Sequence, residues 1–389
     1  MSFPKMEESI VEFWEKEKVF EESVGAREGK DRYVFYDGPP FATGTPHYGH
    51  IVASAIKDTV PRYWTMRGYQ VERKWGWDCH GLPIENIAEK ELGITHKKEI
   101  LELGVEKFNE ICRSKVLEYV GEWKKVMRRF GRFADMEHAY RTMDRDFMES
   151  VWWVFKELWD RGLIYESYRT MHICPRCETT LSQSEVAEGY KDVKDLAVTV
   201  KFELVDEPGT FVLAWTTTPW TIPANQAIGF GPEVAYSLLK AGDGSKYLVA
   251  FSLVDEFLKR TGVEISEQAL SEAGDIKQSI FGPELAGTIA RHPMHHLGGF
   301  YATPRPFLPG EFVTTDSGTG LVHMSPDHGE DDFELCKAYG LEPAFAVMND
   351  GRYRDDWPWL GGADERRRSV INPGFNAPDG PICSDLREA

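Results

Sequence analysis

The pattern of hydrophobic and polar residues predicts an α/β fold for the first part of the chain. Apolar residues recur there at helical spacing between short apolar runs. The pattern predicts strands and helices in this order: a short buried strand over 32–41, a helix from about 46 to 67 that stops at Gly68, a strand over 69–78, and helical stretches over about 85–132 and 144–162. Strands that alternate with helices indicate a parallel sheet.

A different pattern begins after residue 185. Short β-rich runs such as AVTVKFEL, TFVLAWTTT, KYLVAFSLV and FVTTDSGTGLVHM are separated at close intervals by Gly and Pro. We therefore expect two domains: 1–185, with the α/β pattern, and 186–389, with the β-rich pattern.

Composition narrows the class of protein. The 389 residues are 42% hydrophobic and carry a net charge of −18, which suits a globular protein and argues against indiscriminate binding of nucleic acid. This net charge does not exclude a basic patch on one face of the protein. We find no apolar stretch of about 18 residues and no signal-peptide core, so we expect a cytoplasmic protein without a membrane span. Six cysteines do not suggest a disulfide scaffold.

The segment DGPPFATGTPHYGH, residues 37–50, predicts a site for an anion or a nucleotide. It lies between a strand end and a helix start, where free backbone N–H groups and the helix dipole favour phosphate. His47 and His50 are three residues apart and share one face of the first turn. Gly44 and Gly49 would let a flat base or a ribose come close. The alternative is that the two histidines only cap the helix.

Two further motifs contain cysteine or histidine. Cys174 and Cys177 form a CxxC with the spacing of one knuckle of a zinc site, but such a site needs four ligands and no second pair is evident. The alternative is a pair of free thiols. A cluster of three histidines is a rival metal site, although surface or turn histidines are the favoured interpretation: His292, His295 and His296.

The segment LAWTTTPWTIPAN places three threonines together at the end of a β run. Alternation would send Thr216 and Thr218 to one face and Thr217 to the other. About a hundred residues later, GTGLVHMSPDHGEDDFE brings imidazoles and carboxylates, among them His323 and Asp332. The simpler alternative is a β-strand followed by an acidic helix N-terminus.

Taken together, HYGH at 47–50 and GWDCHGLPIE at 76–85 resemble the class I aminoacyl-tRNA synthetases, in particular the isoleucyl members, with Tyr48 at the tolerant second place of the first motif. The fold implied is the N-terminal half of a Rossmann-like nucleotide-binding domain followed by an inserted β-rich editing domain. The resemblance implies that His47 and His50 contact the phosphates of ATP, which binds with Mg²⁺, and that Asp78 holds the α-ammonium of the amino acid. It also implies that ATP or the adenylate is lined by Gly38, Pro39, Pro40 and Gly49, and that Pro39 contacts the amino acid as well.

WTTTPWT and GTGLVH resemble the editing domain of the isoleucyl, valyl and leucyl synthetases, which hydrolyses mischarged aminoacyl-tRNA. The resemblance implies an editing site made of Trp215, Thr216, Thr217, Thr218, His323 and Asp332, in which the threonines position ester and water and Asp332 anchors the ammonium group. Such a domain has a physical reason. One methylene distinguishes isoleucine from valine by only about 1–3 kcal/mol, so a second pocket must supply the remaining selectivity.

We therefore expect an isoleucine–tRNA ligase that edits valine-charged tRNA, with isoleucine, ATP and an isoleucine-accepting tRNA as partners and a monomeric state. The family's K-M-S-K-S loop is absent from these residues, so we expect an N-terminal portion that does not synthesise alone. In the family a later pair often completes the zinc site of Cys174 and Cys177. Three alternatives remain: a valyl or leucyl relative, a deacylase that acts in trans on mischarged tRNA, and an inactive zinc-binding scaffold.

Overall fold

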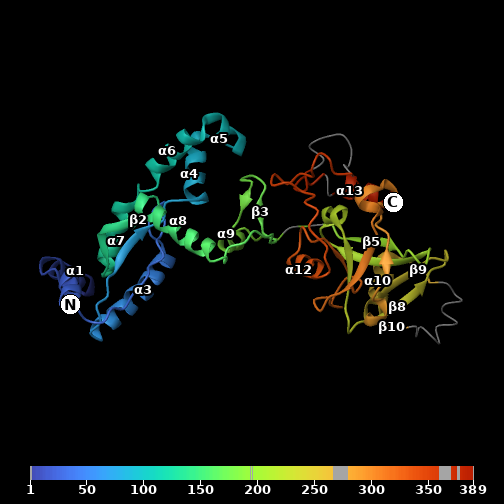
Figure 1. Cartoon of the computed structure of the whole chain (residues 1–389), viewed down its shortest axis with the longest axis horizontal. Coiled ribbons are helices and arrows are strands. Elements are labelled where there is room, and N and C mark those ends of the chain that lie inside the picture. The colour runs from blue at the N-terminus through green and yellow to red at the C-terminus, as the bar shows by residue number, and fades with distance from the viewer. Residues whose placement is uncertain are drawn as a thin grey trace. The chain divides into compact units, whose positions relative to one another are not determined.

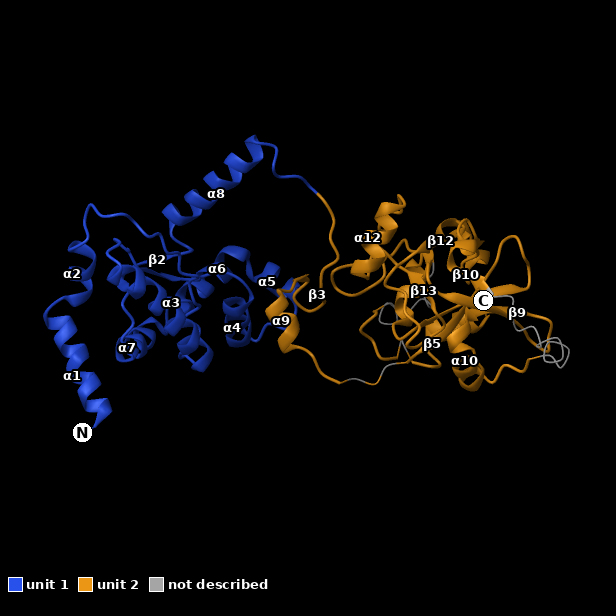
Figure 2. Cartoon of the chain, turned by 90° about the horizontal axis from the view of Figure 1, so that it is seen from below, with its two compact units in different colours: residues 1–166 blue, residues 167–389 orange. Residues whose placement is uncertain are grey.

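The chain folds into two compact units, residues 1–166 and 167–389 (Figure 2). The computed structural model describes residues 2–192, 194, 196–265, 279–358, 369–374 and 377–388. The α/β pattern falls in unit 1 and the β-rich pattern in unit 2, so the predicted succession of fold classes is confirmed. The hairpin that carries the CxxC motif, residues 173–180, belongs to unit 2. The boundary near residue 185 marks where an inserted domain would begin, and it stays a prediction.

Unit 1 is rich in helices (Figure 1). Its elements are α1 (Phe3–Lys16), α2 (Val19–Gly25), α3 (Tyr48–Met66), β1 (Lys74–Trp77), α4 (Leu82–Leu92), α5 (Lys97–Leu103), α6 (Val105–Lys115), α7 (Val120–Phe130), β2 (Asp135–Arg141) and α8 (Arg145–Asp160). The predicted helices 46–67 and 144–162 correspond to α3 and α8. The predicted stretch 85–132 is four helices, and Gly93 and Gly104, both with positive φ, end two of them.

The strands of unit 1 are parallel, as predicted, but they are shorter than predicted. β1 pairs in parallel with β2, a strand that the sequence pattern did not predict. Residues 32–41 form no regular strand. They run beside the β1 segment with two isolated parallel bridges, Arg32 with Gln70 and Phe41 with Asp78. Pro39 and Pro40 lack N–H donors, which explains why a continuous ladder does not form there.

An aromatic cluster forms the core of unit 1. Trp75, Trp77 and Trp123 are each at most 3% exposed, and the ring of Trp123 meets the ring of Trp77 edge-on at 5.9 Å between centroids. The indole N–H of Trp123 donates to the carbonyl of Gly44 at 2.7 Å. Because Trp123 belongs to α7, this bond holds the loop that leads into α3 against the core.

Unit 2 contains two larger sheets and a small hairpin. Its elements are β3 (Ile173–Cys174), β4 (Thr179–Thr180), α9 (Gln183–Glu188), β5 (Val198–Glu203), β6 (Thr210–Thr216), η1 (Pro219–Ala224), β7 (Ala227–Phe230), β8 (Ala235–Lys240), β9 (Lys246–Ala250), η2 (Phe251–Leu253), α10 (Val254–Thr261), β10 (Ser279–Phe281), η4 (Gly282–Leu285), β11 (Ile289–Ala290), η5 (His295–Leu297), η6 (Gly299–Ala302), β12 (Arg305–Pro309), β13 (Leu321–Met324), α12 (Glu330–Ala338) and α13 (Pro381–Glu388).

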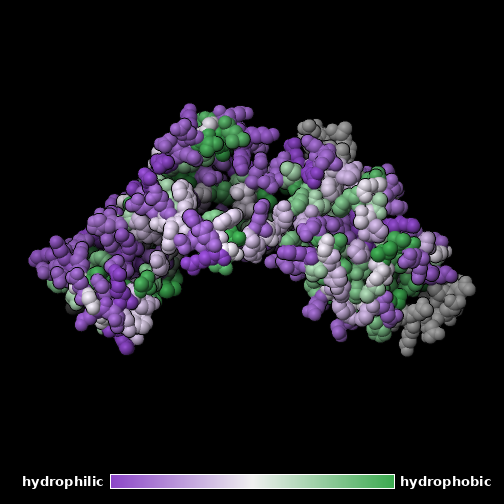
Figure 3. Space-filling model, in the orientation of Figure 1, coloured by the Kyte–Doolittle hydropathy of each residue, from purple (hydrophilic) through white to green (hydrophobic). Residues whose placement is uncertain are grey.

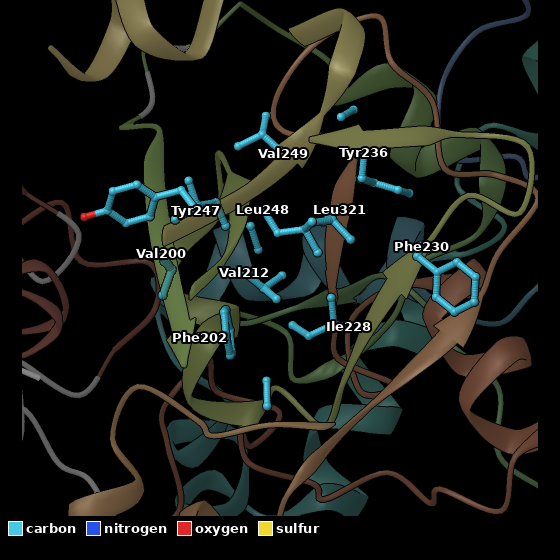
Figure 4. Packing of buried hydrophobic residues seen from close by; sticks show 14 of the residues in the cluster. Val200, Phe202, Val212, Ile228, Phe230, Tyr236, Tyr247, Leu248, Val249 and Leu321 are labelled. Atoms are coloured by element: carbon cyan, nitrogen blue, oxygen red, sulfur yellow. The ribbon is translucent and has the colours of Figure 1, made fainter. Parts of the chain in front are cut away.

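The two sheets of unit 2 enclose its core. One has the order β10-β8-β9-β6-β5 and the other β11-β12-β7-β13. Figure 4 shows Val212 and Leu248 from the first sheet near Ile228 and Leu321 from the second, all at most 2% exposed. Full burial of such a side chain contributes about 1.5–3 kcal/mol. This packing fixes the ends of β6 and β13, which carry the predicted editing residues.

Large apolar side chains also lie on the surface of unit 1. Trp152, Trp153 and Trp159 of α8 are 60–67% exposed. Val52 and Ile56 of α3 are exposed as well, and green patches interrupt the purple surface beside α3 in Figure 3.

In the part of the chain that the structure describes, no helix combines the length and the apolar character that a membrane crossing requires.

Gly76 offers a test of the packing in unit 1. A Cβ at this position would lie 2.2 Å from the ring of Tyr140. That ring is held in place, since it stacks on Phe147 and its hydroxyl donates to the carbonyl of Asp37 at 3.1 Å. We expect Gly76→Ala to lower the free energy of unfolding by about 1–3 kcal/mol, measured by urea denaturation.

Gly121→Ala is the matched control. This glycine is exposed near the start of α7 and has no atom within 4 Å of an added Cβ. Alanine favours helix there, so this variant should be as stable as the parent or more stable by up to about 1 kcal/mol. Equal effects of the two substitutions would contradict the packing described for Gly76.

Candidate functional sites

The two histidines of HYGH lie together at the start of α3. His47 is the N-cap, with an extended backbone (φ −110°, ψ 174°), and its N–H donates to Nδ1 of His50 at 3.2 Å. The two imidazole rings stack with centroids 3.6 Å apart. Because Nδ1 of neutral His50 accepts a hydrogen bond, its proton resides on Nε2, which can donate to a ligand. Burial and the neighbouring His47 lower the pKa of His50.

The glycines around this pair have different roles. A Cβ on Gly49 would lie 3.0 Å from the ring of His47, so a side chain there would displace the imidazole. Gly44 has open space around it, and its carbonyl accepts the indole N–H of Trp123. The ring of Trp123 also packs 4.7 Å from that of His50. The core aromatic cluster therefore supports both the loop and the histidine pair.

The residues that are predicted to bind the amino-acid substrate, Pro39 and Asp78, lie at the end of β1. The backbone N–H of Asp78 donates to the carbonyl of Pro40 at 3.0 Å, which brings the segment 38–40 beside Asp78. The carboxylate of Asp78 is half-buried and lies 3.5 Å from Oγ1 of Thr142. Trp123 connects the two groups of residues, since its ring contacts His50 and Trp77, which precedes Asp78.

Sequence patterns did not single out the residues that hold the 38–40 segment. Nζ of Lys57 donates to the carbonyl of Gly38 at 2.8 Å and pairs with Asp37 at 2.6 Å. Arg132, whose side chain is 3% exposed, also pairs with Asp37 at 2.8 Å. A lysine within an amphipathic helix and an arginine after a helix look ordinary in sequence, so only the fold reveals this cluster.

In unit 2 the three threonines divide as alternation predicts. Oγ1 of Thr216 and Oγ1 of Thr218 are 3.2 Å apart, and the backbone N–H of Thr218 donates to Oγ1 of Thr216 at 3.0 Å. Thr217 is exposed. The end of β6 thus presents one hydroxyl pair on one side and a single hydroxyl to solvent.

His323 is buried and connected to the segment after the threonines. Its Nε2 lies 2.8 Å from Oγ1 of Thr221, and its Nδ1 lies 3.4 Å from Nδ2 of Asn225. Oγ1 of Thr221 donates to the carbonyl of Thr218 at 2.9 Å, so it accepts from Nε2–H. Burial, together with nearby His328, lowers the pKa of His323 to about 3. The imidazole is therefore neutral, and both ring nitrogens have partners within the protein.

Asp332 is the third residue of α12. Its Oδ2 accepts the backbone N–H of Ser325 at 2.7 Å, which ties the helix to the end of β13. A Cβ on Gly329 would lie 2.8 Å from Cγ of Asp332, so a side chain there would displace this carboxylate. Burial, and to a smaller extent Asp331, raises the pKa of Asp332 to about 6.

Trp215 lies on the side of β6 opposite to Thr216. Its half-buried ring lies near Gly318, and the guanidinium of Arg260 sits 5.9 Å from its centroid. The structure therefore brings Thr216, Thr218, His323 and Asp332 to one region through η1 and the end of β13, with Trp215 and Thr217 on the other side of the strand. Three residues around this region were not predicted: Thr221, Asn225 and Ser325.

The cysteine motif forms a hairpin. Cys174 ends β3, and Cys177 lies in the turn, where the guanidinium of Arg176 approaches its sulfur at 3.5 Å. Burial and the neighbouring Cys174 raise the pKa of the Cys177 thiol. Among the described residues, no group of three or more His, Cys, Asp or Glu side chains could hold a metal ion. A closed zinc site needs four ligands, so the described residues do not fit one.

The expectation that the three clustered histidines lie at the surface or in turns is correct for two of them. His295 and His296 are exposed, whereas His292 is fully buried. Nε2–H of His292 donates to the carbonyl of Ile222 at 2.9 Å, and Nδ1 accepts from the N–H of Met294. Its role is to pack η1 against the loop after β11, which a short histidine-rich motif does not reveal.

Comparisons with known proteins identify the family. Residues 9–347 match the family described as tRNA synthetases class I (I, L, M and V), and the chain belongs to that family. Similar curated proteins include the isoleucine–tRNA ligases of Treponema denticola, 43% identical over 366 residues that cover 88% of this chain, and of Bdellovibrio bacteriovorus, 43% identical over 92% of this chain. The chain spans about one third of their length, 33% in both cases.

A solved complex of Agrobacterium radiobacter K84 agnB2 LeuRS with tRNA and LeuAMS is also similar. It is 16% identical, with a TM-score of 0.34, over 95% of this chain and 46% of that chain. This similarity is too low for a comparison of individual residues.

The raised pKa of Asp332 predicts how stability depends on pH. Between about pH 4 and pH 6 the folded state holds a proton that the unfolded state has released, so the free energy of unfolding falls as pH rises through this window. The total change is about 2–3 kcal/mol. We expect Asp332→Asn to remove it, so that urea denaturation at pH 7.5 finds this variant more stable than the parent by about that amount, with a smaller gap at pH 5.

Glu334→Gln, an exposed position of the same helix, is the control. It should leave the pH dependence of the parent unchanged. A parent and Asp332→Asn variant with parallel pH profiles would contradict the assignment.

Proposed function

We propose that this chain carries the ATP- and amino-acid-binding elements of an isoleucine–tRNA ligase and an editing unit that hydrolyses valine-charged tRNA. The observation that carries the proposal is that the hydroxyls of Thr216 and Thr218, His323 and Asp332 lie close to η1. The 43% identity to an isoleucine–tRNA ligase supports it. The substrates are isoleucine, ATP with Mg²⁺ and the isoleucine-accepting tRNA.

In unit 1, the start of α3 suits a phosphate group. Backbone N–H groups and the positive end of the helix dipole meet there with Nε2–H of His50 and the ring of His47. We assign to both histidines the stabilisation of the negative charge that develops when ATP and isoleucine form the adenylate. Asp78, half-buried beside the 38–40 segment, would hold the α-ammonium.

In unit 2, hydrolysis of a mischarged ester requires a positioned water and an anchored ammonium group. The hydroxyls of Thr216 and Thr218 can orient water at the end of β6. The carboxyl group of Asp332 is ionised above about pH 6, and in this form it can pair with the ammonium group of the substrate. His323 supports this arrangement from within, because its bond to Thr221 fixes the turn after the threonines.

Two other functions would use the same hydrolysis of a mischarged tRNA, and the choice of substrate distinguishes them from the proposed one. A valyl or leucyl enzyme would prefer its own mischarged tRNA, and a deacylase acting in trans would need no synthetic activity. For Cys174 and Cys177 we propose only that the pair could supply two thiolates to a site completed by other residues. We further propose a cytoplasmic, monomeric state.

Deacylation tests the editing proposal directly. We expect the 389-residue chain to hydrolyse valine-charged isoleucine tRNA. Asp332→Ala should change this selectivity, for instance by allowing cleavage of isoleucine-charged tRNA as well, because the anchor of the ammonium is lost. Release of labelled amino acid measures both. Absence of hydrolysis from a folded sample would contradict the editing proposal for this chain.

ATP binding tests the synthetic site. We expect His47→Ala and His50→Ala each to weaken ATP binding about tenfold, the effect of one lost hydrogen bond to a charged group, in isothermal titration calorimetry. His138→Ala, an exposed imidazole on β2, should bind as the parent does. Unchanged affinity in both of the first two variants would contradict the assignment of the pair to phosphate.

A further inference from the structure

The outer edge of β5 is a place where a further strand could pair. β5 is the last strand of its sheet, and it pairs along its whole length only with β6, in antiparallel orientation. In such a pair the backbone groups of alternate residues point to opposite sides. The N–H of Leu204 donates to the carbonyl of Thr210 at 2.8 Å, so the even-numbered residues from 198 to 204 face β6. The backbone groups of Thr199, Lys201 and Glu203 therefore face outwards.

Another segment covers one end of this edge and leaves the rest free. The N–H of Arg291, just after β11, donates to the carbonyl of Glu203 at 2.7 Å. Two residues later Pro293 has no N–H to continue the ladder, and the chain goes on to η5. Among the described residues, the backbone N–H and C=O groups of Thr199 and Lys201 have no hydrogen-bond partner.

A cavity of about 550 Å³ opens over this free edge, and we call it the β5 groove. β5 contributes residues 198–201 and 203 to its lining, and the loop after β11 contributes residues 291–293 and 295. Cys383, Leu386 and Arg387 of α13, which lies beside β5 in Figure 1, complete it. Pockets of about 300–1,000 Å³ commonly hold ligands. The free edge therefore lines a hollow that has room for an added chain.

The β5 groove is positively charged in a chain whose net charge is −18. Lys201 and Arg387 are exposed and form no ion pair within the part of the chain that the structure describes. The ammonium of Lys201 lies 5.1 Å from the centroid of the Phe211 ring, which also lines the groove. Among the described lining residues Glu203 is the one carboxylate, and Arg291 pairs with it at 2.7 Å. Three cations and one carboxylate give the lining a net charge of +2 with histidine counted as neutral.

The free backbone groups and this charge together favour one kind of occupant. Phosphate oxygens would neutralise the cations, but they accept hydrogen bonds and so leave the carbonyls of Thr199 and Lys201 without a donor. Pairing with β5 of a second copy would bring the cations of both copies together, which opposes it. A peptide strand supplies donors and acceptors at the spacing of β5, and its carboxylates can pair with the cations.

We propose that the free edge of β5 binds an extended acidic segment of a partner protein as an added β-strand. About five residues of the segment would lie along β5, since its free edge runs from Thr199 to the N–H of Glu203. Main-chain hydrogen bonds to Thr199 and Lys201 provide the affinity, and pairing of carboxylates with Lys201 and Arg387 selects an acidic sequence. No residue assigned above to ATP, to the amino acid or to editing lines the groove, so this is a separate interaction function.

The central test titrates the unmodified 389-residue chain into a fluorescein-labelled peptide of seven residues, in which four glutamates alternate with three valines. Fluorescence anisotropy measures the binding. We expect the affinity to exceed that of the same peptide with lysine in place of glutamate by at least about tenfold. N-methylation of every peptide bond keeps the side chains and removes the main-chain donors, so it should weaken binding more than about tenfold. Equal binding of the methylated and unmethylated peptides would overturn the inference.

Substitutions in the groove test the role of its charge. Lys201→Glu and Arg387→Glu should each weaken binding of the acidic peptide about tenfold, because each replaces an attractive charge with a repulsive one. Lys240→Glu is the matched control. Lys240 is exposed on β8, three strands away, and Lys246 lies opposite, so this variant should bind as the parent does. An equal loss in all three folded variants would contradict the inference, because it would report only the net charge of the chain.

Hydrogen exchange locates the bound peptide. We expect the amides of Thr199 and Lys201 to exchange more slowly when the acidic peptide is present. Binding without slower exchange at these two amides would place the peptide elsewhere and overturn the inference. Binding of a ten-nucleotide oligouridylate that Lys201→Glu abolishes, with no binding of the peptide, would assign the groove to nucleic acid instead. None of these measurements uses ATP or charged tRNA, so their failure leaves the proposed function unaffected.

Discussion

The hydrogen bond between Thr221 and His323 is the contact on which the candidate site of unit 2 depends. It joins residues 102 positions apart and ties the turn after β6 to β13, which belongs to the other sheet. Because both groups are buried, loss of either partner would leave a polar atom without water or protein to bind it, a cost of about 1–3 kcal/mol. Thr216 and Thr218 lie three to five residues before one end of this bond, and Asp332 is tied to the segment after the other end, since its Oδ2 accepts the backbone N–H of Ser325.

Burial gives the same region its electrostatic character. The pKa values of His323 and His328 are lowered and that of Asp332 is raised, so each group favours its uncharged form more than it would in water. At neutral pH the two imidazoles carry no charge, whereas the carboxylate of Asp332 is ionised. The ionised carboxylate can attract a cation such as an ammonium group, and the neutral imidazoles do not repel it.

How much could be predicted from the sequence differs between elements. The periodicity correctly located α3 and α8, because each is a long amphipathic or apolar helix with clear ends. It failed at residues 32–41, where two prolines prevent a ladder, and at β2, which shows no apolar alternation. Motifs drew attention to the histidine pair and the threonines by their local spacing, and the roles assigned to these residues stay predictions. They did not identify Lys57, which contacts the segment 37–38 from α3, or Ser325, which bonds to the carbonyl of Ala224 and to Asp332, because neither residue belongs to a recognisable motif.

The tryptophan-bearing surface of α8 has a practical consequence. Dyes such as ANS become fluorescent when they bind exposed apolar surface, and three indoles 60–67% exposed on one helix provide such a surface in the folded chain. A melting experiment that relies on such a dye would therefore begin with a high signal and show a small or inverted transition. Circular dichroism, which observes the backbone, reports the unfolding of this protein without that background.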